Sequence, residues 1–232
     1  TFAKIIDPLV DVVLVGDSLG MVIQGASNTL SVTMDAVVYH SRAVAQGLAQ
    51  AHLVADMPFM SYQASTEDAL RNAGRLLSEG HAQSVKLEGG VAMAPTVEKL
   101  VTSGIPVMGH IGLTPQSVNT LGGYKIQGKT TSSRDSLIMD AIALEEAGAY
   151  SLVLEGVPAE LASAISERIH IPTIGIGAGP GCDGQVLVLT DLLGLNPDFN
   201  PKFLKKYAEL ASVVAKAISQ YSSEVRDGQF PA

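Results

Sequence analysis

Short runs of apolar and often β-branched residues alternate along the chain with longer segments in which apolar residues recur every three or four positions. The short runs predict strands that are covered on both faces, and the longer segments predict amphipathic helices. The expected strands are residues 12–16, 52–55, 84–87, 106–109, 151–154, 173–176 and 186–189. Strands that alternate with helices are typical of parallel sheets joined by crossover helices.

The expected helices are residues 2–9, 66–79, 134–147, 159–169 and 202–226. Seven strands in such an alternation fit an open α/β sheet, whereas a closed barrel needs eight. If residues 2–9 are the first helix of a barrel, its strand lies just before Thr1. We therefore predict an α/β fold, a (β/α)8 TIM-type barrel whose first strand is missing upstream of residue 1. An open α/β sheet is the second interpretation.

Length and composition agree with one large buried core. The chain has 232 residues, of which 47% are hydrophobic and 16% charged, so we expect residues 1–232 to form a single catalytic barrel domain. No apolar run approaches the ~20 residues that span a bilayer. The net charge of −8 argues against nucleic-acid binding. Cys182 is the only cysteine, which suits the reducing cytoplasm. We expect a cytoplasmic protein with small-molecule partners.

Ionisable side chains follow five expected strands in succession. They are Asp17, Asp56, Glu88, His110 and Glu155. Lys86 lies two residues before Glu88, so both side chains point to the same face of their strand. The carboxyl ends of barrel strands converge on one mouth, where the catalytic groups of such enzymes lie. A single Asp after a strand is more often a turn former or a helix cap, but five ionisable residues in succession favour a shared site.

Three carboxylates at one mouth repel one another unless a cation lies among them. We therefore interpret Asp17, Asp56 and Glu88 as ligands of a divalent cation. Oxygen ligands favour a hard ion such as Mg²⁺, which keeps coordination positions for water or substrate oxygens. Zinc fits less well, because Cys182 is solitary and only His110 among the histidines ends a strand.

Two glycine-rich segments have their own interpretations. Residues 179–184 match the spacing G-x-G-x-x-G, but an apolar run that predicts a strand follows them, whereas a dinucleotide-binding fingerprint opens a helix. We therefore expect no nucleotide site there. The polar loop of residues 122–133 is either a mobile lid or a plain flexible loop, and the sequence favours neither.

Seven segments together carry a resemblance to a known family. They are GDSLGM at 16–21, ADMPF at 55–59, VKLEGG at 85–90, GHIGLTPQS at 109–117, GGYKIQG at 122–128, LE at 154–155 and IGIGAG at 174–179. Each alone is a weak signal, but in this order and over nearly the whole chain they closely resemble ketopantoate hydroxymethyltransferase. Two positions depart from the family's pattern: Gly156 stands where the family usually has Cys, and Thr190 where it often has His.

The resemblance implies that a hydroxymethyl unit passes from 5,10-methylenetetrahydrofolate to 3-methyl-2-oxobutanoate, giving 2-dehydropantoate for pantothenate synthesis. It implies Mg²⁺ as the metal and a homo-oligomer, which is a decamer in bacterial members. By matching motifs, the implied metal ligands are Asp17, Asp56 and Glu88, and Glu155 is the implied proton acceptor. The implied 2-oxoacid contacts are Asp17, Ser18, Asp56 and Lys86, with His110 as a further polar residue lining the site.

Other functions fit parts of this pattern. A lyase of the phosphoenolpyruvate mutase and isocitrate lyase type would share the barrel, the metal and enolate chemistry without folate, but the catalytic-cysteine motif of that group is absent from the sequence. An aldolase that forms a Schiff base through Lys86 is a further alternative. A non-catalytic barrel subunit is the alternative from a different class of protein.

Overall fold

The computed structural model describes residues 1–231, in which two compact units are distinguished. The first unit runs from Thr1 to Gln185 and the second begins at Val186. Every candidate site residue lies in the first unit. That the whole chain acts as one catalytic domain stays a prediction.

The first unit contains a seven-stranded sheet in which every neighbouring pair is parallel. Its strands are β1 (Val12–Val15), β2 (His52–Asp56), β3 (Ser84–Glu88), β4 (Val107–Gly112), β5 (Ser151–Glu155), β6 (Thr173–Ile176) and β7 (Gly184–Gln185), in this spatial order. A doubly wound sheet reverses its strand order at a switch point, whereas the wall of a β/α barrel adds each strand beside the preceding one. The observed order confirms the barrel class and argues against the open-sheet interpretation.

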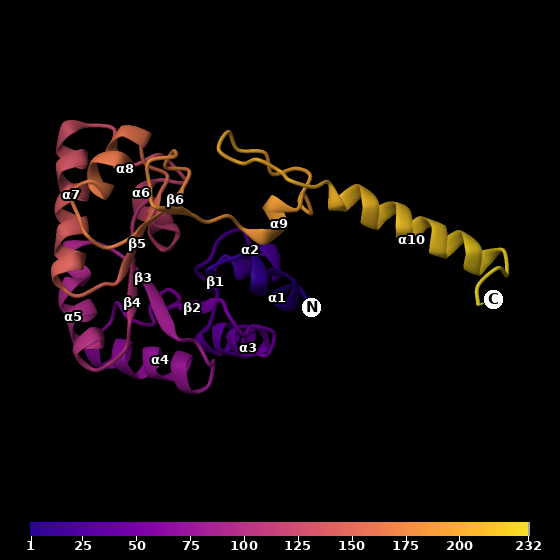
Figure 1. Ribbon diagram of the computed structural model, residues 1–232, viewed down its shortest axis with the longest axis horizontal. Helices are drawn as coiled ribbons and strands as arrows, with labels where there is room; N and C mark the ends of the chain where they lie inside the picture. Colours follow the sequence, from indigo (N-terminus) through magenta and orange to yellow (C-terminus); the bar gives the residue numbers. More distant parts are fainter. Residues whose placement is uncertain (232) are drawn as a thin grey trace. The chain divides into compact units, whose positions relative to one another are not determined.

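Helices cover the outside of this sheet (Figure 1). The first unit contains α1 (Phe2–Ile6), α2 (Leu19–Val22), α3 (Met34–Ala45), α4 (Thr66–Ser78), α5 (Ala94–Thr102), α6 (Val118–Leu121), α7 (Thr131–Glu146) and α8 (Ala159–Ser166), with 3₁₀ helices η1 (Asp7–Leu9), η2 (Val91–Met93) and η3 (Pro115–Ser117). The hydroxyls of Thr33, Ser65 and Thr130 accept backbone N–H bonds and begin α3, α4 and α7. These caps explain why the long helices start where they do.

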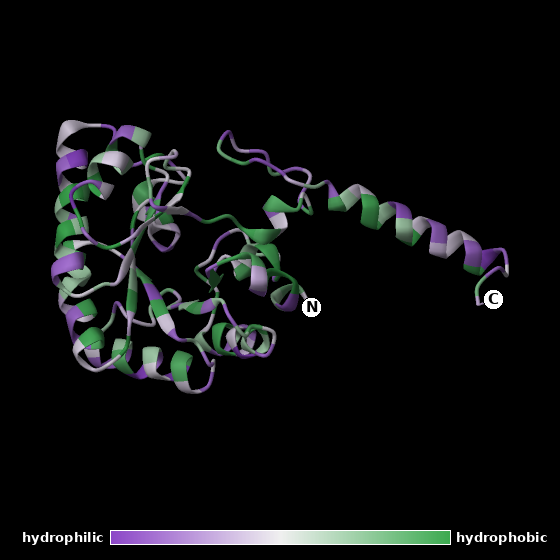
Figure 2. Ribbon diagram, in the orientation of Figure 1, coloured by the Kyte–Doolittle hydropathy of each residue, from purple (hydrophilic) through white to green (hydrophobic). Residues whose placement is uncertain are grey.

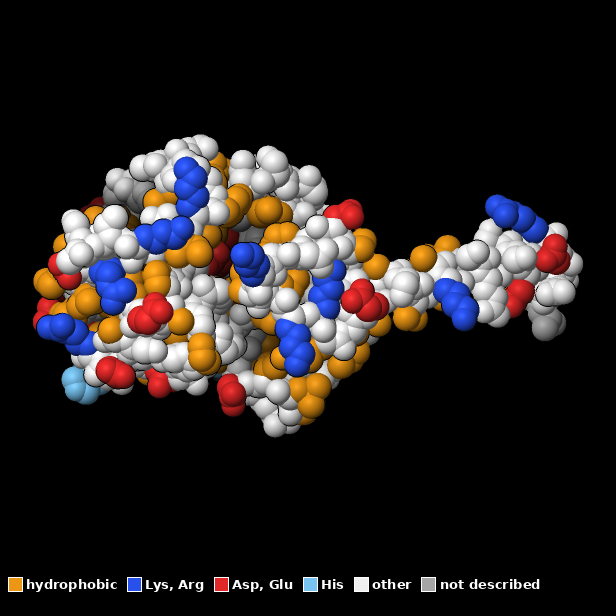
Figure 3. All heavy atoms as spheres, turned by 90° about the horizontal axis from the view of Figure 1, so that it is seen from above, with side chains coloured by type: hydrophobic (Ala, Val, Ile, Leu, Met, Phe, Trp, Pro, Cys, Tyr) orange, Lys and Arg blue, Asp and Glu red, His pale blue; other side chains and the backbone are white. Residues whose placement is uncertain are grey.

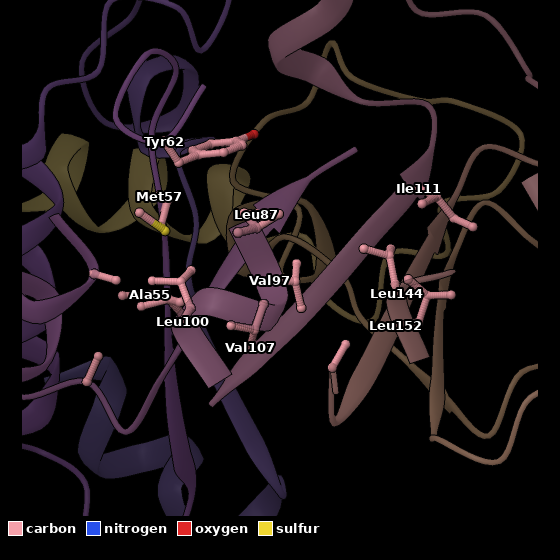
Figure 4. Close-up of a cluster of buried hydrophobic side chains, with 14 of the residues drawn as sticks. Ala55, Met57, Tyr62, Leu87, Val97, Leu100, Val107, Ile111, Leu144 and Leu152 are labelled. Atoms are coloured by element: carbon pink, nitrogen blue, oxygen red, sulfur yellow. The ribbon is translucent and has the colours of Figure 1, made fainter. Parts of the chain in front are cut away.

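Residues along each strand alternate between two faces of the sheet. On the outer face, Ala55 and Leu87 belong to the large apolar cluster shared with the helices, part of which is shown in Figure 4. The inner face carries a smaller apolar cluster of Val54, Met108 and Val153. The helices therefore pack on one side of the sheet only, and the inner side is free to hold polar groups above its small apolar layer.

Two expected elements were wrong. Residues 186–189 do not form a strand; the seventh strand is Gly184–Gln185, positioned by the Asp183 carboxylate, which accepts bonds from the backbone N–H and hydroxyl of Thr173. A short apolar run does not by itself distinguish a strand from other buried structure. The terminal helix α10 is Leu210–Arg226, shorter than the expected 202–226. The backbone N–H of Tyr207 donates to the Leu192 carbonyl and not to a carbonyl four residues earlier, as it would in a helix.

The second unit contains α9 (Leu189–Leu192) and α10. Hydrophobic and hydrophilic residues are interspersed along α10 (Figure 2), and none of its residues is buried. Over residues 1–231, no helix combines the length and the apolar character needed to cross a membrane.

Candidate active site

The candidate side chains of β2 to β5 lie on the inner face at the carboxyl ends of the strands. They are Asp56, Lys86, Glu88, His110 and Glu155, with Asp17 two residues after β1. Strand register places Asp56 beside Lys86, Glu88 beside His110 and Gly112 beside Glu155. All but Glu155 are buried, whereas the Glu155 side chain is 23% exposed. The structure thus brings the predicted groups together and leaves one carboxylate reachable from the mouth.

Asp17 and Asp56 form a direct contact at the ends of β1 and β2. The backbone N–H of Asp17 donates to Asp56 Oδ2 over 2.9 Å, and Lys86 Nζ lies 2.8 Å from Asp56 Oδ1. A Cβ atom at Gly16 would lie 2.8 Å from Ser18 Oγ and 3.3 Å from Asp56 Oδ2. The absence of a side chain at Gly16 therefore lets the two segments approach so closely. Ser18 is half-buried at the start of α2, next to this contact.

Burial of these charges shifts their protonation. Burial, and then the Asp56 charge, raise the pKa of Asp17 to about 7, against the opposing effect of Lys86. Burial lowers the pKa of Lys86, but the charges of Asp56, Glu88 and Asp17 outweigh it and raise that pKa above its ordinary value. Lys86 therefore stays an ammonium ion. It faces three carboxylates, so a further cation would relieve the repulsion among them.

His110 connects the buried carboxylates with the more exposed Glu155. Its Nε2 lies 3.2 Å from Glu155 Oε2, and its Nδ1 lies 3.2 Å from Lys86 Nζ and 3.6 Å from Glu88 Oε1. Burial and the Lys86 charge lower the pKa of His110, but its contacts with Glu155 and Glu88 prevail and raise it to about 9. The imidazole therefore spans the distance between Glu155 and the inner charge cluster.

Two residues of the site had no predicted role. Gln116, in η3 after β4, donates from Nε2 to Asp17 Oδ2 over 2.8 Å and from its backbone N–H to Glu88 Oε2 over 3.0 Å. The Tyr62 hydroxyl accepts the Glu88 backbone N–H over 3.0 Å. Neither residue ends a strand and neither carries a charge, so the pattern of ionisable residues after strands does not identify them.

The donor chemistry of the cluster suits a hard divalent cation. One oxygen of each carboxylate accepts an N–H bond, namely Asp17 Oδ2, Asp56 Oδ2 and Glu88 Oε2. Among residues 1–231, no three His, Cys, Asp or Glu side chains are grouped as a complete metal cage. Mg²⁺ commonly takes one or two protein carboxylates and completes its shell with water and substrate. Asp17 and Asp56 form a buried pair of carboxylates of this kind, and the roles of Asp17, Asp56 and Glu88 as metal ligands stay predictions.

The loop expected at residues 122–133 is shorter, because α7 begins at Thr131. Residues 122–130 approach the same mouth. Tyr124 donates from its hydroxyl to Met21 Sδ over 3.7 Å, which links this loop to α2 after β1. Burial, and then the charges of Glu155 and Asp17, raise the pKa of Tyr124. The loop therefore lies over the charged end of the sheet, and its motion as a lid stays a prediction.

A parallel sheet in chain order, with acid and base groups buried at the carboxyl ends of its strands, defines a β/α-barrel enzyme. The chain belongs to the ketopantoate hydroxymethyltransferase family, whose model matches residues 1–232. It is similar to 3-methyl-2-oxobutanoate hydroxymethyltransferase of Pelobacter propionicus, at 56% identity over 99% of this chain and 86% of that protein. The enzyme of that name from Carboxydothermus hydrogenoformans is 61% identical over 95% of this chain and 80% of that protein. The predicted family resemblance is confirmed.

Solved structures support the fold. The trigonal crystal form of 2,3-dimethylmalate lyase, a PEP mutase/isocitrate lyase superfamily member, has a TM-score of 0.61 and 15% identity, covering 98% of this chain and 77% of that chain. A phosphonomutase assigned as putative from Burkholderia cenocepacia J2315 has a TM-score of 0.59 and 12% identity, covering 97% and 89%. At these identities the likeness concerns the fold alone.

Proposed function

We propose that this chain is a 3-methyl-2-oxobutanoate hydroxymethyltransferase that forms 2-dehydropantoate, with 5,10-methylenetetrahydrofolate as donor and Mg²⁺ as the metal. The observation that carries the proposal is the inner cluster at the strand ends. It combines a carboxylate pair for a metal, a buried ammonium and a separate carboxylate open to the mouth. The product belongs to pantothenate biosynthesis, and we place the enzyme in the cytoplasm.

The reaction requires removal of the proton from C3 of the oxoacid and stabilisation of the resulting enolate. Glu155 is the proton acceptor, because it is the most exposed acid of the cluster and its Oε2 is oriented by His110. The Lys86 ammonium stabilises negative charge on the substrate oxygens. C3 then bonds to the methylene carbon of the donor, and the two bonds from that carbon to the folate nitrogens break. Water supplies the oxygen of the new hydroxyl, and the proton removed from C3 and one proton of the water end on the two nitrogens, so that tetrahydrofolate leaves. The enzyme itself forms no covalent bond.

Asp17 and Asp56, with Glu88, are the residues that would hold the metal, and Ser18 is an additional polar contact for the oxoacid. Bound Mg²⁺ supplies a Lewis acid for the carboxylate and keto oxygens of the substrate. The pKa of Asp17 is raised to about 7, so a nearby positive charge would stabilise the ionised form of this carboxyl group.

The charged state of Lys86 argues against the Schiff-base alternative. A Schiff base forms from a neutral amine, whereas Lys86 lies 2.8 Å from an Asp56 oxygen and its pKa is raised. The lyase alternative rests on fold similarity alone, and a folate requirement separates it from the proposed transferase. A non-catalytic role leaves the buried acid and base groups without a purpose.

The decisive experiment measures C3 deuterium exchange of 3-methyl-2-oxobutanoate, with and without Mg²⁺ and tetrahydrofolate. Glu155→Gln should retain metal-dependent oxoacid binding but lose exchange. Glu160→Gln, which changes an exposed glutamate of α8, is the matched control and should exchange normally. Undiminished exchange in Glu155→Gln removes that residue from the role, and absence of exchange and of folate-dependent product in the unaltered protein refutes the function.

We further propose a homo-oligomer, a decamer by family resemblance, with small molecules as its only other partners. On the face shown in Figure 3, Lys and Arg side chains lie singly among acidic and apolar ones, which does not favour nucleic-acid binding. Sedimentation velocity measures the subunit number directly. A monomer at working concentrations would contradict this part of the proposal.

A further inference from the structure

We propose that Gln116 is a positioning residue that determines which oxygens of Asp17 and Glu88 are available to a ligand in the barrel mouth. The inference rests on the proposed function, because it concerns the same metal and oxoacid site. It adds to the charged residues of that site an uncharged one, which does not end a strand.

Gln116 reaches three neighbouring strand ends from a fourth. It is 6% exposed and lies in η3, directly after β4. Its Nε2 donates to Asp17 Oδ2 over 2.8 Å and to the Met57 carbonyl over 2.9 Å, after β1 and β2 respectively. Its backbone N–H donates to Glu88 Oε2 over 3.0 Å, at the end of β3. One residue thus holds one oxygen of each of two acids.

The amide of Gln116 has a single favourable orientation. Its Oε1 accepts from the Tyr62 hydroxyl over 2.8 Å and from Gln63 Nε2 over 2.9 Å. Both donors and both acceptor positions of the amide are therefore used. A flipped amide would turn its oxygen toward the Met57 carbonyl and the ionised Asp17 carboxylate, both of which only accept hydrogen bonds. The hydrogen-bond network therefore fixes which end of the amide faces Asp17, and the two orientations of the amide are not equivalent.

Tyr62 anchors this network to the apolar core. Its side chain is 1% exposed and belongs to the same cluster as Met57 and Leu87 (Figure 4). Its hydroxyl donates to Gln116 and accepts the backbone N–H of Glu88 over 3.0 Å. The position of the Gln116 amide is therefore set by a rigid part of the molecule, which is what orientation of a ligand carboxylate requires.

These bonds leave particular carboxylate oxygens available to a ligand. With Asp17 Oδ2 occupied by a neutral donor, Asp17 Oδ1 is the oxygen that remains for a cation or for water. Glu88 Oε2 is likewise occupied, and Glu88 Oε1 lies beside His110 Nδ1, 3.6 Å away. A neutral amide achieves this without adding a positive charge that would compete with a metal. Loss of the amide leaves the Asp17 carboxylate free to rotate and Met57 without its donor.

The first test compares Gln116→Met, which keeps the side-chain length but has no hydrogen-bonding amide, with Ser117→Ala, which changes the exposed neighbour in η3. Calorimetry measures 3-methyl-2-oxobutanoate binding in the presence of Mg²⁺. Partners that orient metal ligands typically contribute about 10–100-fold in affinity, so Gln116→Met should lose about that much and Ser117→Ala should bind like the unaltered protein. A folded Gln116→Met with unaltered affinity overturns the proposal.

The second test uses neither metal nor substrate and keeps the proposal testable if Gln116→Met does not fold. Gln116→Asn retains an amide but is one methylene too short to make all four contacts. Its shift of the thermal unfolding midpoint is compared in the unaltered and the Asp17→Ala backgrounds. We expect a clearly smaller shift in the Asp17→Ala background, because the shared contact is already lost. Equal shifts overturn the inference, whereas failure of C3 exchange in the unaltered protein overturns only the proposed function.

Discussion

Asp17 should weaken the metal-free fold at neutral pH, and Asp17→Asn tests this. Burial and the neighbouring Asp56 raise the pKa of Asp17 to about 7 from an ordinary value of 3.8. Between these values the native state holds a proton that the unfolded chain has lost. Stability therefore falls as the pH rises through this window and stays low above about pH 7. At 1.36 kcal/mol per pKa unit, the full effect is about 4 kcal/mol.

Asparagine keeps the shape of the side chain and an oxygen for the Gln116 bond, but carries no charge. Asp17→Asn should therefore match the unaltered protein near pH 4 and exceed it by about 4 kcal/mol in free energy of unfolding above pH 7. Urea unfolding across this pH range, without divalent metal, measures the difference. Because the proposed function makes Asp17 a metal ligand, Mg²⁺ should stabilise the unaltered protein and leave Asp17→Asn nearly unaffected.

Asp7 supplies a control of opposite sign. Its carboxylate accepts backbone N–H bonds from Ala51, Gln50 and Ala49, which lower its pKa. Asp7→Asn should therefore lose stability at neutral pH and lose less in acid, since the carboxylate stabilises the fold only when ionised. A stability gain of Asp17→Asn that is the same at pH 4 and pH 8 would refute the reasoning, because it would not arise from ionisation.

Two further substitutions test the packing of the cluster. Lys86→Met leaves the Asp56 carboxylate buried without its 2.8 Å partner, so it should cost about 3–5 kcal/mol in denaturant unfolding at neutral pH; unaltered stability would contradict the ion pair. Gly16→Ala should weaken metal-dependent oxoacid binding in calorimetry, since the new methyl group would meet Ser18 Oγ at 2.8 Å. Its control, Gly74→Ala in α4, meets nothing within 4 Å and should raise stability by about 0.5–1 kcal/mol. Equal binding by both glycine variants would contradict the close approach.

Much of the site follows from local pattern. A side chain two positions from another on a strand shares its face, so the sequence alone places Lys86 and Glu88 together. The convergence of Asp17, Asp56 and Glu155 needed only the further rule that parallel barrel strands end at one mouth. These predictions depend on periodicity and strand direction, and both can be inferred from the order of the residues alone.

Other features depend on contacts between distant parts of the chain. Residues 186–189 have a strand-like composition, but the bond between Asp183 and Thr173 places the pairing at Gly184–Gln185 instead. Residues 202–209 continue a helical pattern, yet the backbone of Tyr207 bonds to Leu192. In both cases a hydrogen bond between residues ten or more positions apart prevails over a weak local preference.

By itself the sequence determined the βα alternation, the barrel class, the family and the charged members of the site. Only the tertiary structure decided how those charges are oriented. Gln116 lies 99 positions from Asp17 in the chain, and Tyr62 joins it from the loop after β2. A neutral amide or phenol has no periodic signature, and its role arises only when folding brings its acceptors within hydrogen-bonding distance.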